Sequence, residues 1–344
     1  MKIAVIAAAS KNGERGGAER FYEGLLRALR AASGCRGGGG VDLISLISDE
    51  SSFDSIKESY LNFYELELSK YDGVISTKAP SYIINHPNHI CYLVHTMRVF
   101  YDMFDKEFPH PDKTLSAQRK FLQTLDTKAL GCVRTKKIFS IGNEVSRRLK
   151  KFNSLESEVM HPALSNDNFI SGKYGDYLFI PGRLHRWKRI DLLIEAVRLT
   201  VTPVRLLIAG TGEDEFYFKK LAAGNKKVEF LGKVGDDELV RLYSGAFAVP
   251  FVPLNEDYGY VTLEAFKSKK PVITCTDSGE PAYFVRNGES GFVCKPNPVE
   301  LSKKIDFLYK NKETAKKMGN RGFSGIAGIN WENIAAKLLS ALEK

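Results

Sequence analysis

Residues 177–196 read YLFIPGRLHRWKRIDLLIEA, and this stretch holds the pattern that decides the fold. Its first five residues form a short apolar run of the length of a buried strand, and Gly182 then marks a turn. From residue 190 onward the apolar residues recur at helical spacing. A strand, a turn and a helix in this order begin a βαβ unit, whose helix returns the chain to a second, parallel strand. We therefore expect an α/β fold built on parallel sheets.

Short apolar runs continue this alternation on both sides of the stretch. Downstream they are VRLLIAG (204–210), VEFLG (228–232), AFAVPF (246–251), PVITC (271–275) and GFVCK (291–295). Upstream they are KIAVIAAA (2–9), VDLISLI (41–47), YDGVIST (71–77), HICYLVH (89–95) and KKIFSIG (136–142). Because domains average roughly 150 residues, 344 residues suit two of them. We expect Rossmann-like domains at 1–168 and 169–327, followed by a C-terminal helix at 328–344.

The C-terminal helix has one apolar face and two possible partners. That face is formed by Trp331, Ile334, Leu338, Leu339 and Leu342. An ordinary final helix of the second domain and a helix that crosses back to the first domain both agree with this pattern.

Composition excludes several classes of protein. Hydrophobic residues make up 43% of the chain and charged residues 26%, as is typical of soluble globular proteins. No apolar run approaches the roughly 20 residues of a membrane-spanning helix, and the start does not have the pattern of a signal peptide. The five cysteines are scattered and include no CxxC pair, which argues against disulfides and zinc. We expect a cytoplasmic protein.

Two glycine-containing turns are candidates for ligand contact. Gly16 and Gly17 lie between the first strand and the first helix, where backbone amides can meet an anion or a polar acceptor. Gly210 and Gly212 follow the strand at 204–210 and form a turn that a phosphate can approach. Glu215 stands where a dinucleotide fingerprint has its third glycine, so an NAD site is a poor interpretation.

Charged residues follow two strands of the second domain. Arg183 and Lys188 come after the strand at 177–181, where two cations around a turn can hold a diphosphate. In NEDYGYVTLEAFKSKKPVIT (255–274), Glu256 and Glu264 lie eight residues apart on either side of a helix start. Carboxylates accept hydrogen bonds from vicinal hydroxyls, so one can hold a ribose and the other a sugar.

These motifs together resemble the retaining glycosyltransferases of family 4. The matching features, in the family's order, are GGAER, GRL with the following lysine, IAGTGE, FLG, the E-x7-E pair, and PVITC followed by NGESGFV. The resemblance implies the GT-B fold, in which two Rossmann-like domains face each other across a cleft. It also implies a nucleotide-sugar donor.

The resemblance assigns roles to individual residues. Glu256 contacts the donor sugar and Glu264 the ribose, while Arg183 and Lys188 stabilise the departing diphosphate in place of a metal ion. His95 falls where the family has a histidine near the reacting sugar. With Glu256, Arg183 and Lys188 it completes the expected catalytic group. The donor-binding group is Glu264 together with Gly16, Gly17, Gly210, Gly212, Leu231, Gly232, Gly259, Tyr260, Val261 and Thr262.

No metal or other cofactor is expected, and the sequence contains no Asp-x-Asp. It departs from the family at two places. The usual histidine–aspartate pair is His95–Thr96, and the usual glycine pair after PVI is Ser278–Gly279 followed by Glu280. Both departures concern acceptor geometry and sugar choice.

The expected activity is transfer of a hexose from a UDP- or GDP-linked sugar to a saccharide or lipid-linked acceptor, with retention, in the synthesis of cell-surface glycans. A nucleotide-sugar epimerase or a phosphorylase on the same fold is an alternative, because fold does not determine reaction. A basic nucleic-acid-binding protein is a third interpretation, although no recognisable binding motif is present.

Basic residues are concentrated in one region. Residues 96–151 contain 13 Lys or Arg and 6 Asp or Glu, a net charge of +7 out of +9 for the whole chain. Aromatic residues interleave with these cations, among them Phe100, Tyr101, Phe104, Phe108 and Phe121. Cations beside aromatic residues are typical of membrane interfaces, so we expect peripheral contact with an anionic membrane and no nucleic-acid partner. The alternative is a solvated helical face whose aromatic residues lie in the core.

Overall fold

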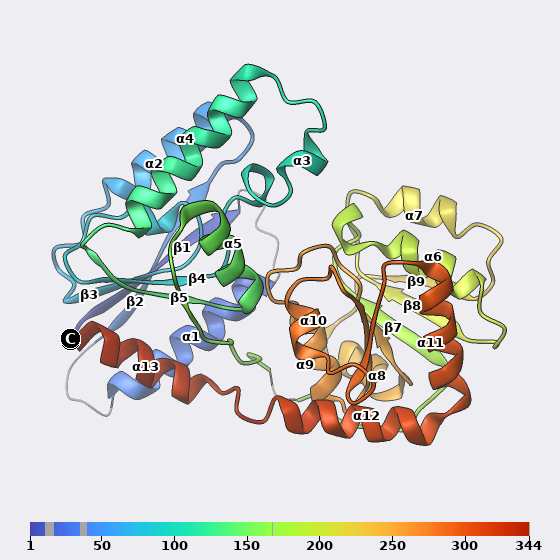
Figure 1. Ribbon diagram of the computed structural model, residues 1–344. Coiled ribbons are helices and arrows are strands. Elements are labelled where there is room, and N and C mark those ends of the chain that lie inside the picture. The colour runs from blue at the N-terminus through green and yellow to red at the C-terminus, as the bar shows by residue number, and fades with distance from the viewer. Residues whose placement is uncertain (11–16, 35–39, 167, 344) are drawn as a thin grey trace. The chain divides into compact units, whose positions relative to one another are not determined.

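The computed structural model describes residues 1–10, 17–34, 40–166 and 168–343 (Figure 1). The chain divides into two compact units, one formed by residues 1–165 with 329–344 and the other by residues 166–328. Each unit is built of parallel strands and helices, as the alternation in the sequence predicts.

The described part of the first unit contains a six-stranded parallel sheet with the order β2-β1-β3-β4-β5-β6. Its strands are β1 (Ile3–Ser10), β2 (Val41–Ser48), β3 (Gly73–Ser76), β4 (His89–Leu93), β5 (Thr135–Ser140) and β6 (Glu158–Val159). Its helices are α1 (Gly17–Gly34), α2 (Phe53–Tyr64), α3 (Phe104–Glu107), α4 (Lys113–Leu130), α5 (Asn143–Asn153) and α13 (Trp331–Glu343), with short 3₁₀ turns η1 (Ser81–Ile83) and η2 (Arg98–Phe100). The two-residue β6 was not predicted, because two residues carry no periodic signal.

Strand β1 is buried on both faces, which explains its nearly continuous apolar sequence. Ala4, Ile6 and Ala8 pack in one cluster with Phe63 of α2. Side chains alternate along a strand, so the buried residues between them face the other side of the sheet. In Figure 1, α2 and α4 cover one face of this sheet, and α1 and α13 cover the other.

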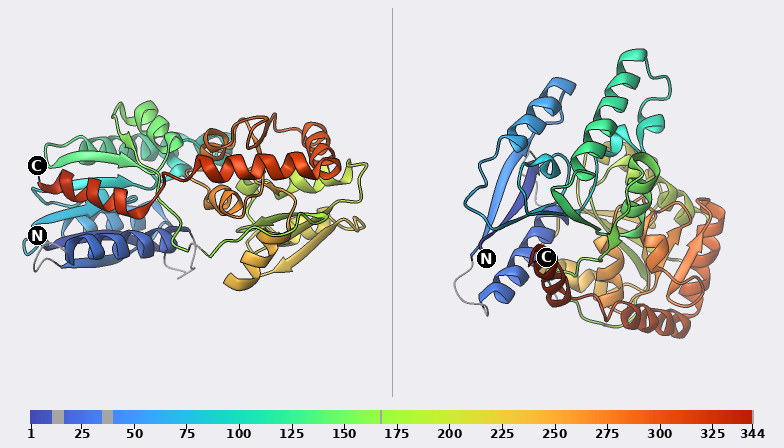
Figure 2. Two further views of the ribbon diagram at one scale, coloured as in Figure 1. Left: turned by 90° about the horizontal axis from the view of Figure 1, so that it is seen from below. Right: turned by 60° about the vertical axis from the view of Figure 1, so that its left-hand side comes forward.

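Helix α13 belongs to the first unit, so the helix that crosses back is the arrangement found. Figure 2 shows it running beside α1. The Trp331 ring lies 6.0 Å from the Phe21 ring, and its Nε1 donates a hydrogen bond of 3.0 Å to the carbonyl of Leu164. A Cβ at Gly24 would lie 2.3 Å from the indole, so only glycine leaves room for Trp331 on this face of α1.

The described part of the second unit contains two three-stranded parallel sheets, ordered β7-β8-β9 and β10-β11-β12. The strands are β7 (Tyr177–Pro181), β8 (Arg205–Ala209), β9 (Val228–Gly232), β10 (Val249–Pro250), β11 (Val272–Cys275) and β12 (Gly291–Cys294). The helices are α6 (Ile190–Arg198), α7 (Glu215–Leu221), α8 (Asp236–Gly245), α9 (Tyr260–Lys267), α10 (Glu280–Phe284), α11 (Pro298–Lys310) and α12 (Lys312–Gly325), with the 3₁₀ turn η3 (Arg186–Lys188). A parallel bridge between Leu178 and Ala248 joins the sheets side by side. The strands therefore follow one another in the order β9-β8-β7-β10-β11-β12.

The aromatic residues of the basic region 96–151 lie mainly in the core of the first unit, which corrects their expected place at a membrane surface. Phe100, Tyr101 and Phe104 are 6%, 1% and 2% exposed. The hydroxyl of Tyr101 donates to the buried carboxylate of Asp126, so this ring packs against the buried side of α4. Only Phe121 of the five expected aromatic residues is largely exposed, at 48%.

We predict that Trp331→Ala lowers the free energy of unfolding of the first unit by about 3–5 kcal/mol, because it empties a large buried site. The measurement is denaturant unfolding of the full chain, with separate transitions fitted where the two units unfold independently. Phe216→Ala is the control, since Phe216 is 81% exposed and its loss is expected to change stability by less than about 0.5 kcal/mol. Equal effects of the two substitutions would show that α13 is not integral to the first unit.

Candidate functional site

The strand order of the second unit places its predicted site residues at one point. After β7 the chain moves outward to β8 on one side, and β10 then begins on the other side and moves outward to β11. In open α/β sheets ligands bind beyond the carboxyl ends of the strands where the order reverses in this way. Arg183 and Lys188 follow β7 and Glu256 follows β10, so all three lie at this reversal.

Lys188 and Glu256 form the central contact of the site. Lys188 Nζ lies 2.7 Å from Glu256 Oε2, and the two side chains are 26% and 17% exposed. The backbone N–H of Leu254 donates a hydrogen bond of 2.7 Å to the carbonyl of Trp187. The structure thus brings together two residues that are 68 positions apart and that the sequence predicted separately.

Arg183 pairs with a carboxylate that the sequence analysis did not select. Its Nε lies 2.9 Å from Oε2 of Glu213, and both side chains are about half exposed. Burial acts to raise the pKa of the Glu213 carboxyl, but its own backbone N–H and the Arg183 guanidinium hold that pKa below its usual range. Glu213 directly follows Gly212, so this carboxylate belongs to the glycine turn that was expected to approach a phosphate.

Glu264 is buried within α9 and is not a surface residue of that helix. It is 4% exposed, and its Oε2 accepts a hydrogen bond of 2.6 Å from the hydroxyl of Tyr243. The Tyr243 ring packs edge-on against Phe169 and Phe179, at 5.5 Å and 5.0 Å. Tyr243 was not predicted, because nothing in the sequence around α8 distinguishes it from an ordinary core tyrosine.

Gly259 sets the start of α9 beside Glu256. Its φ of +77° is unfavourable for residues with a side chain, and a Cβ there would lie 2.7 Å from the Phe251 ring and 3.4 Å from Glu256 Cγ. Helix α9 begins at the next residue, and its first turn contains Tyr260, Val261 and the fully buried Thr262. The amino end of α9, with its partial positive charge, therefore lies next to the Lys188–Glu256 pair.

Gly210 and Gly212 of the expected donor group have a packing role. A Cβ at Gly210 would lie 2.0 Å from the Gly182 carbonyl, so the loops after β7 and β8 touch through their backbones. A Cβ at Gly212 would likewise meet the backbone of Leu184. Gly232, which follows Leu231 at the end of β9, accepts a hydrogen bond of 2.7 Å from the N–H of Gly210. Donor contact by these residues stays a prediction.

In the first unit, His95 follows β4 at the carboxyl edge of the sheet. Its Nδ1–H donates to the carbonyl of Thr96 at 2.9 Å, and its own carbonyl accepts from the N–H of Ala79 at 3.2 Å. Gly17 is the first residue of α1, whereas Gly16 lies outside the described residues.

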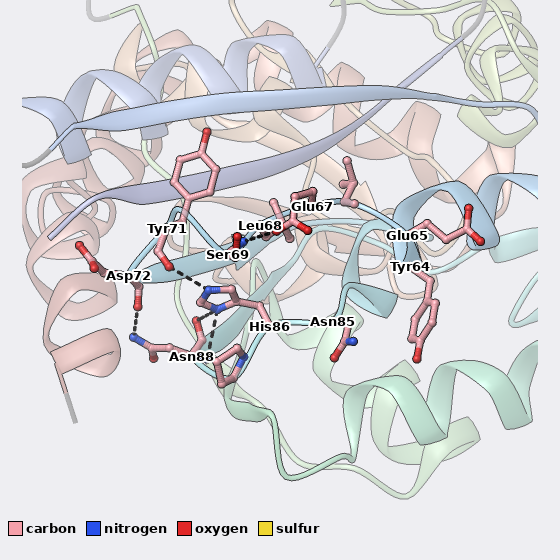
Figure 3. A pocket seen from close by; sticks show the side chains of 12 residues that line it. Tyr64, Glu65, Glu67, Leu68, Ser69, Tyr71, Asp72, Asn85, His86 and Asn88 are labelled. Atoms are coloured by element: carbon pink, nitrogen blue, oxygen red, sulfur yellow. Dashed lines mark hydrogen bonds between the residues drawn. The ribbon is translucent and has the colours of Figure 1, made fainter.

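A pocket of about 610 Å³ lies at the opposite edge of this first sheet, near the amino ends of β3 and β4 (Figure 3). His86 lines it, but both of its ring nitrogens are engaged. Nε2–H donates to the Tyr71 carbonyl at 3.0 Å, and Nδ1 accepts from the Asn88 N–H at 3.1 Å. These bonds join the loops that enter β3 and β4, so His86 has a structural role. Ligands of parallel sheets bind at the other edge.

No group of three or more His, Cys, Asp or Glu side chains among the residues that the structure describes is arranged to hold a metal ion. No helix within the same residues is long and apolar enough to cross a membrane.

Residues 165–324 match the family model described as glycosyl transferases group 1. The match includes Arg183, Lys188, Glu256 and Glu264. This segment is therefore similar to the group 1 glycosyl transferases.

Two relatives of this chain are named as transferases of different sugars. The D-rhamnosyltransferase WbpZ of Pseudomonas aeruginosa is 30% identical over 146 residues, which cover 42% of this chain and 38% of the relative. The alpha-1,3/1,6-mannosyltransferase ALG2 of Homo sapiens is 28% identical over 203 residues, covering 50% and 49%. The chain thus spans half or less of the length of these relatives.

Solved structures match the whole chain in fold. Anabaena HepE in complex with UDP and glucose has a TM-score of 0.73 at 15% identity, covering 100% of this chain and 99% of that chain. WaaG, a glycosyltransferase involved in lipopolysaccharide biosynthesis, has a TM-score of 0.73 at 14% identity, with 99% of both chains covered. The fold is therefore of the GT-B type, with two Rossmann-like units.

Proposed function

We propose that the protein is a retaining glycosyltransferase that moves a hexose from a UDP- or GDP-linked donor to a saccharide or lipid-linked acceptor. The observation that carries the proposal is the Lys188–Glu256 contact at the strand reversal of the second unit, within the segment that matches the glycosyl transferase family model. The contact lies where α/β sheets hold nucleotides, and a carboxylate is a group that can accept hydrogen bonds from sugar hydroxyls. The names of the rhamnosyl- and mannosyltransferase relatives, and the UDP held by HepE, support a nucleotide-sugar donor.

In the proposed reaction the bond between the anomeric carbon and the diphosphate oxygen breaks, and the acceptor hydroxyl oxygen forms a new bond to that carbon. The departing diphosphate takes the hydroxyl proton on the same face of the sugar, so the configuration is retained. Arg183 and Lys188 stabilise the negative charge that develops on the leaving group. Since two side-chain cations and the amino end of α9 supply this stabilisation, we propose that no metal ion is required.

The two glutamates have separate tasks in this mechanism. Glu256, beside Lys188 and the start of α9, accepts hydrogen bonds from the sugar. Glu264 accepts hydrogen bonds from the ribose hydroxyls. The hydrogen bond that it receives from Tyr243 limits the rotamers that its side chain can adopt. His95, in the first unit, acts near the reacting sugar.

We propose further that the enzyme touches anionic membranes through α4. Lys113, Lys120 and Lys128 are exposed on this helix, whose only acidic residue, Asp126, is fully buried. Each cation near an anionic surface contributes about 1 kcal/mol, so the attachment is weak and reversible. A lipid-linked acceptor suits an enzyme held in this way.

We predict that Glu264→Gln weakens nucleotide binding, whereas Glu256→Gln lowers kcat and leaves nucleotide binding unchanged. Loss of a charge-assisted hydrogen bond costs about 1.5–3 kcal/mol, which is roughly a 10- to 150-fold effect. Calorimetric titration with UDP and GDP measures the first effect, and transfer from UDP- and GDP-hexoses measures the second. Glu300→Gln, an exposed carboxylate on α11, is the control. The same small effect in all three variants would refute both assignments.

We predict that transfer activity survives excess EDTA, while Arg183→Ala and Lys188→Ala each reduce kcat/KM by at least ~100-fold. The assay compares the initial rate before and after chelation, with and without added Mg²⁺ or Mn²⁺. Lys219→Ala is a matched loss of a cation, because Lys219 also pairs with a glutamate but lies on the exposed side of α7. Loss of activity in EDTA, restored by either metal, would contradict the proposed role of the two cations.

We predict that changing Lys113, Lys120 and Lys128 together to Glu abolishes co-sedimentation with anionic vesicles at low salt. A vesicle of phosphatidylcholine and phosphatidylglycerol is the probe, and pure phosphatidylcholine is the neutral comparison. Changing the exposed Lys303, Lys310 and Lys317 of the second unit to Glu alters net charge equally and serves as the control. Equal binding of the wild type to neutral and anionic vesicles would rule out the membrane contact.

A further inference from the structure

Arg189, the residue after Lys188, makes an unusually complete set of contacts. Its Nε donates to the Val252 carbonyl at 2.6 Å, and its Nη2 donates to the Pro253 carbonyl at 2.8 Å. Its Nη1 and Nη2 also hold both carboxylate oxygens of Asp277, at 2.8 Å and 2.7 Å. The Arg189 side chain is 16% exposed. One guanidinium therefore ties the loop after β7 to the loops after β10 and β11.

The two loops that Arg189 holds are the ones that support Glu256. The backbone N–H of Asn255 donates to the Asp277 carbonyl at 2.9 Å, and that of Glu256 donates to the Ser278 carbonyl at 3.0 Å. The N–H of Glu280 returns a bond of 2.9 Å to the Glu256 carbonyl. The backbone of Glu256 is thus anchored on the segment that begins with the carboxylate partner of Arg189.

The adjacent cations Lys188 and Arg189 bind different carboxylates. Lys188 pairs with Glu256 and Arg189 pairs with Asp277, so each carboxylate has its own cation. Without Arg189 the carboxylate of Asp277 would lose its bidentate partner, and the carbonyls of Val252 and Pro253 would lose their donors. The loop after β10 is also joined to the loop after β7 by the Lys188–Glu256 pair and the Leu254–Trp187 bond.

The backbone of Arg189 has an unfavourable conformation, which its side-chain contacts can help to hold. Its φ is +51°, in the left-handed region that residues with a Cβ adopt at a cost. Such a conformation persists where surrounding contacts hold it, and the planar fork of arginine can satisfy a carboxylate and two carbonyls together. A lysine at this position has one point charge and cannot reproduce that geometry.

We propose that Arg189 is a positioning residue, which acts through Asp277 and the carbonyls of residues 252–253 to hold Glu256 against Lys188. Its guanidinium binds Asp277 and backbone carbonyls, and it acts on Glu256 and Lys188 only through them. The kinetic part of this inference rests on the proposed glycosyltransferase function, whereas the structural part does not.

The test compares Arg189→Lys, Arg189→Gly and Asp277→Asn with the wild-type full chain. Arg189→Gly removes the guanidinium while relieving the left-handed backbone, so it separates loss of the contacts from loss of folding. Arg198→Lys is the matched control, because Arg198 on α6 also holds a carboxylate, Glu195, and a carbonyl, that of Leu221. Thermal unfolding of every variant is recorded alongside.

The first readout is hydrogen exchange in peptides covering residues 252–258 and 276–282. We expect exchange at least tenfold faster in the three test variants, wild-type exchange in Arg198→Lys, and unfolding midpoints close to that of the wild type. Unchanged exchange in Arg189→Gly and Asp277→Asn would overturn the inference. This readout needs no substrate, so it tests positioning even if the wild type transfers no sugar and the proposed function fails.

The second readout is kinetic and applies once the wild type is shown to transfer a hexose from UDP- or GDP-hexose. We expect kcat to fall at least tenfold in the three variants while the KM for the donor changes less than threefold, because a displaced Glu256 affects the reacting sugar more than the nucleotide. Faster exchange with an unchanged kcat would overturn the role of Arg189 in positioning Glu256.

Discussion

Parallel strands can be joined only by crossover connections, so the loops that follow them all gather at one edge of the sheet. In the second unit this constraint brings the loops after β7, β8, β10 and β11 together where the strand order reverses. Those loops contain Arg183, Lys188, Glu213, Glu256 and Asp277. Residues about 90 positions apart in the chain become neighbours for this reason alone.

The ion pairs at this edge differ in burial, and burial determines how much each pair contributes to stability. The Arg183–Glu213 pair is about half exposed, so solvent screening leaves it a small contribution to stability. Lys188 and Glu256 are 26% and 17% exposed, and Arg189 is 16% exposed and bidentate. A half-open pair can exchange its carboxylate for another anion at little cost, whereas the more enclosed contacts are better suited to holding loops in place.

The sequence predicted the order of elements well because the signals for them are local. Every apolar run that was expected to form a strand overlaps one, whereas the short β6 was not expected. The strand, turn and helix expected at 177–196 are β7, η3 and α6. The errors concern residues whose environment depends on distant parts of the chain. Phe100, Tyr101 and Phe104 were placed at a membrane surface, but all three are buried in the core, where the Tyr101 hydroxyl donates to Asp126 of α4.

Residue types and their spacing by themselves determined the α/β class, the two series of strands, and the glutamate and cation motifs of the second unit. Only the tertiary structure decided that α13 packs on α1, because the apolar face of a helix does not specify its partner. The missing side chain at Gly24 leaves the space that Trp331 fills. The pairing of Lys188 with Glu256 and the contacts of Arg189 and Tyr243 were likewise decided by the fold. Hydrophobic periodicity acts over a few residues and is visible in a sequence, whereas the partner of a charge depends on which loops the sheet brings to the same edge.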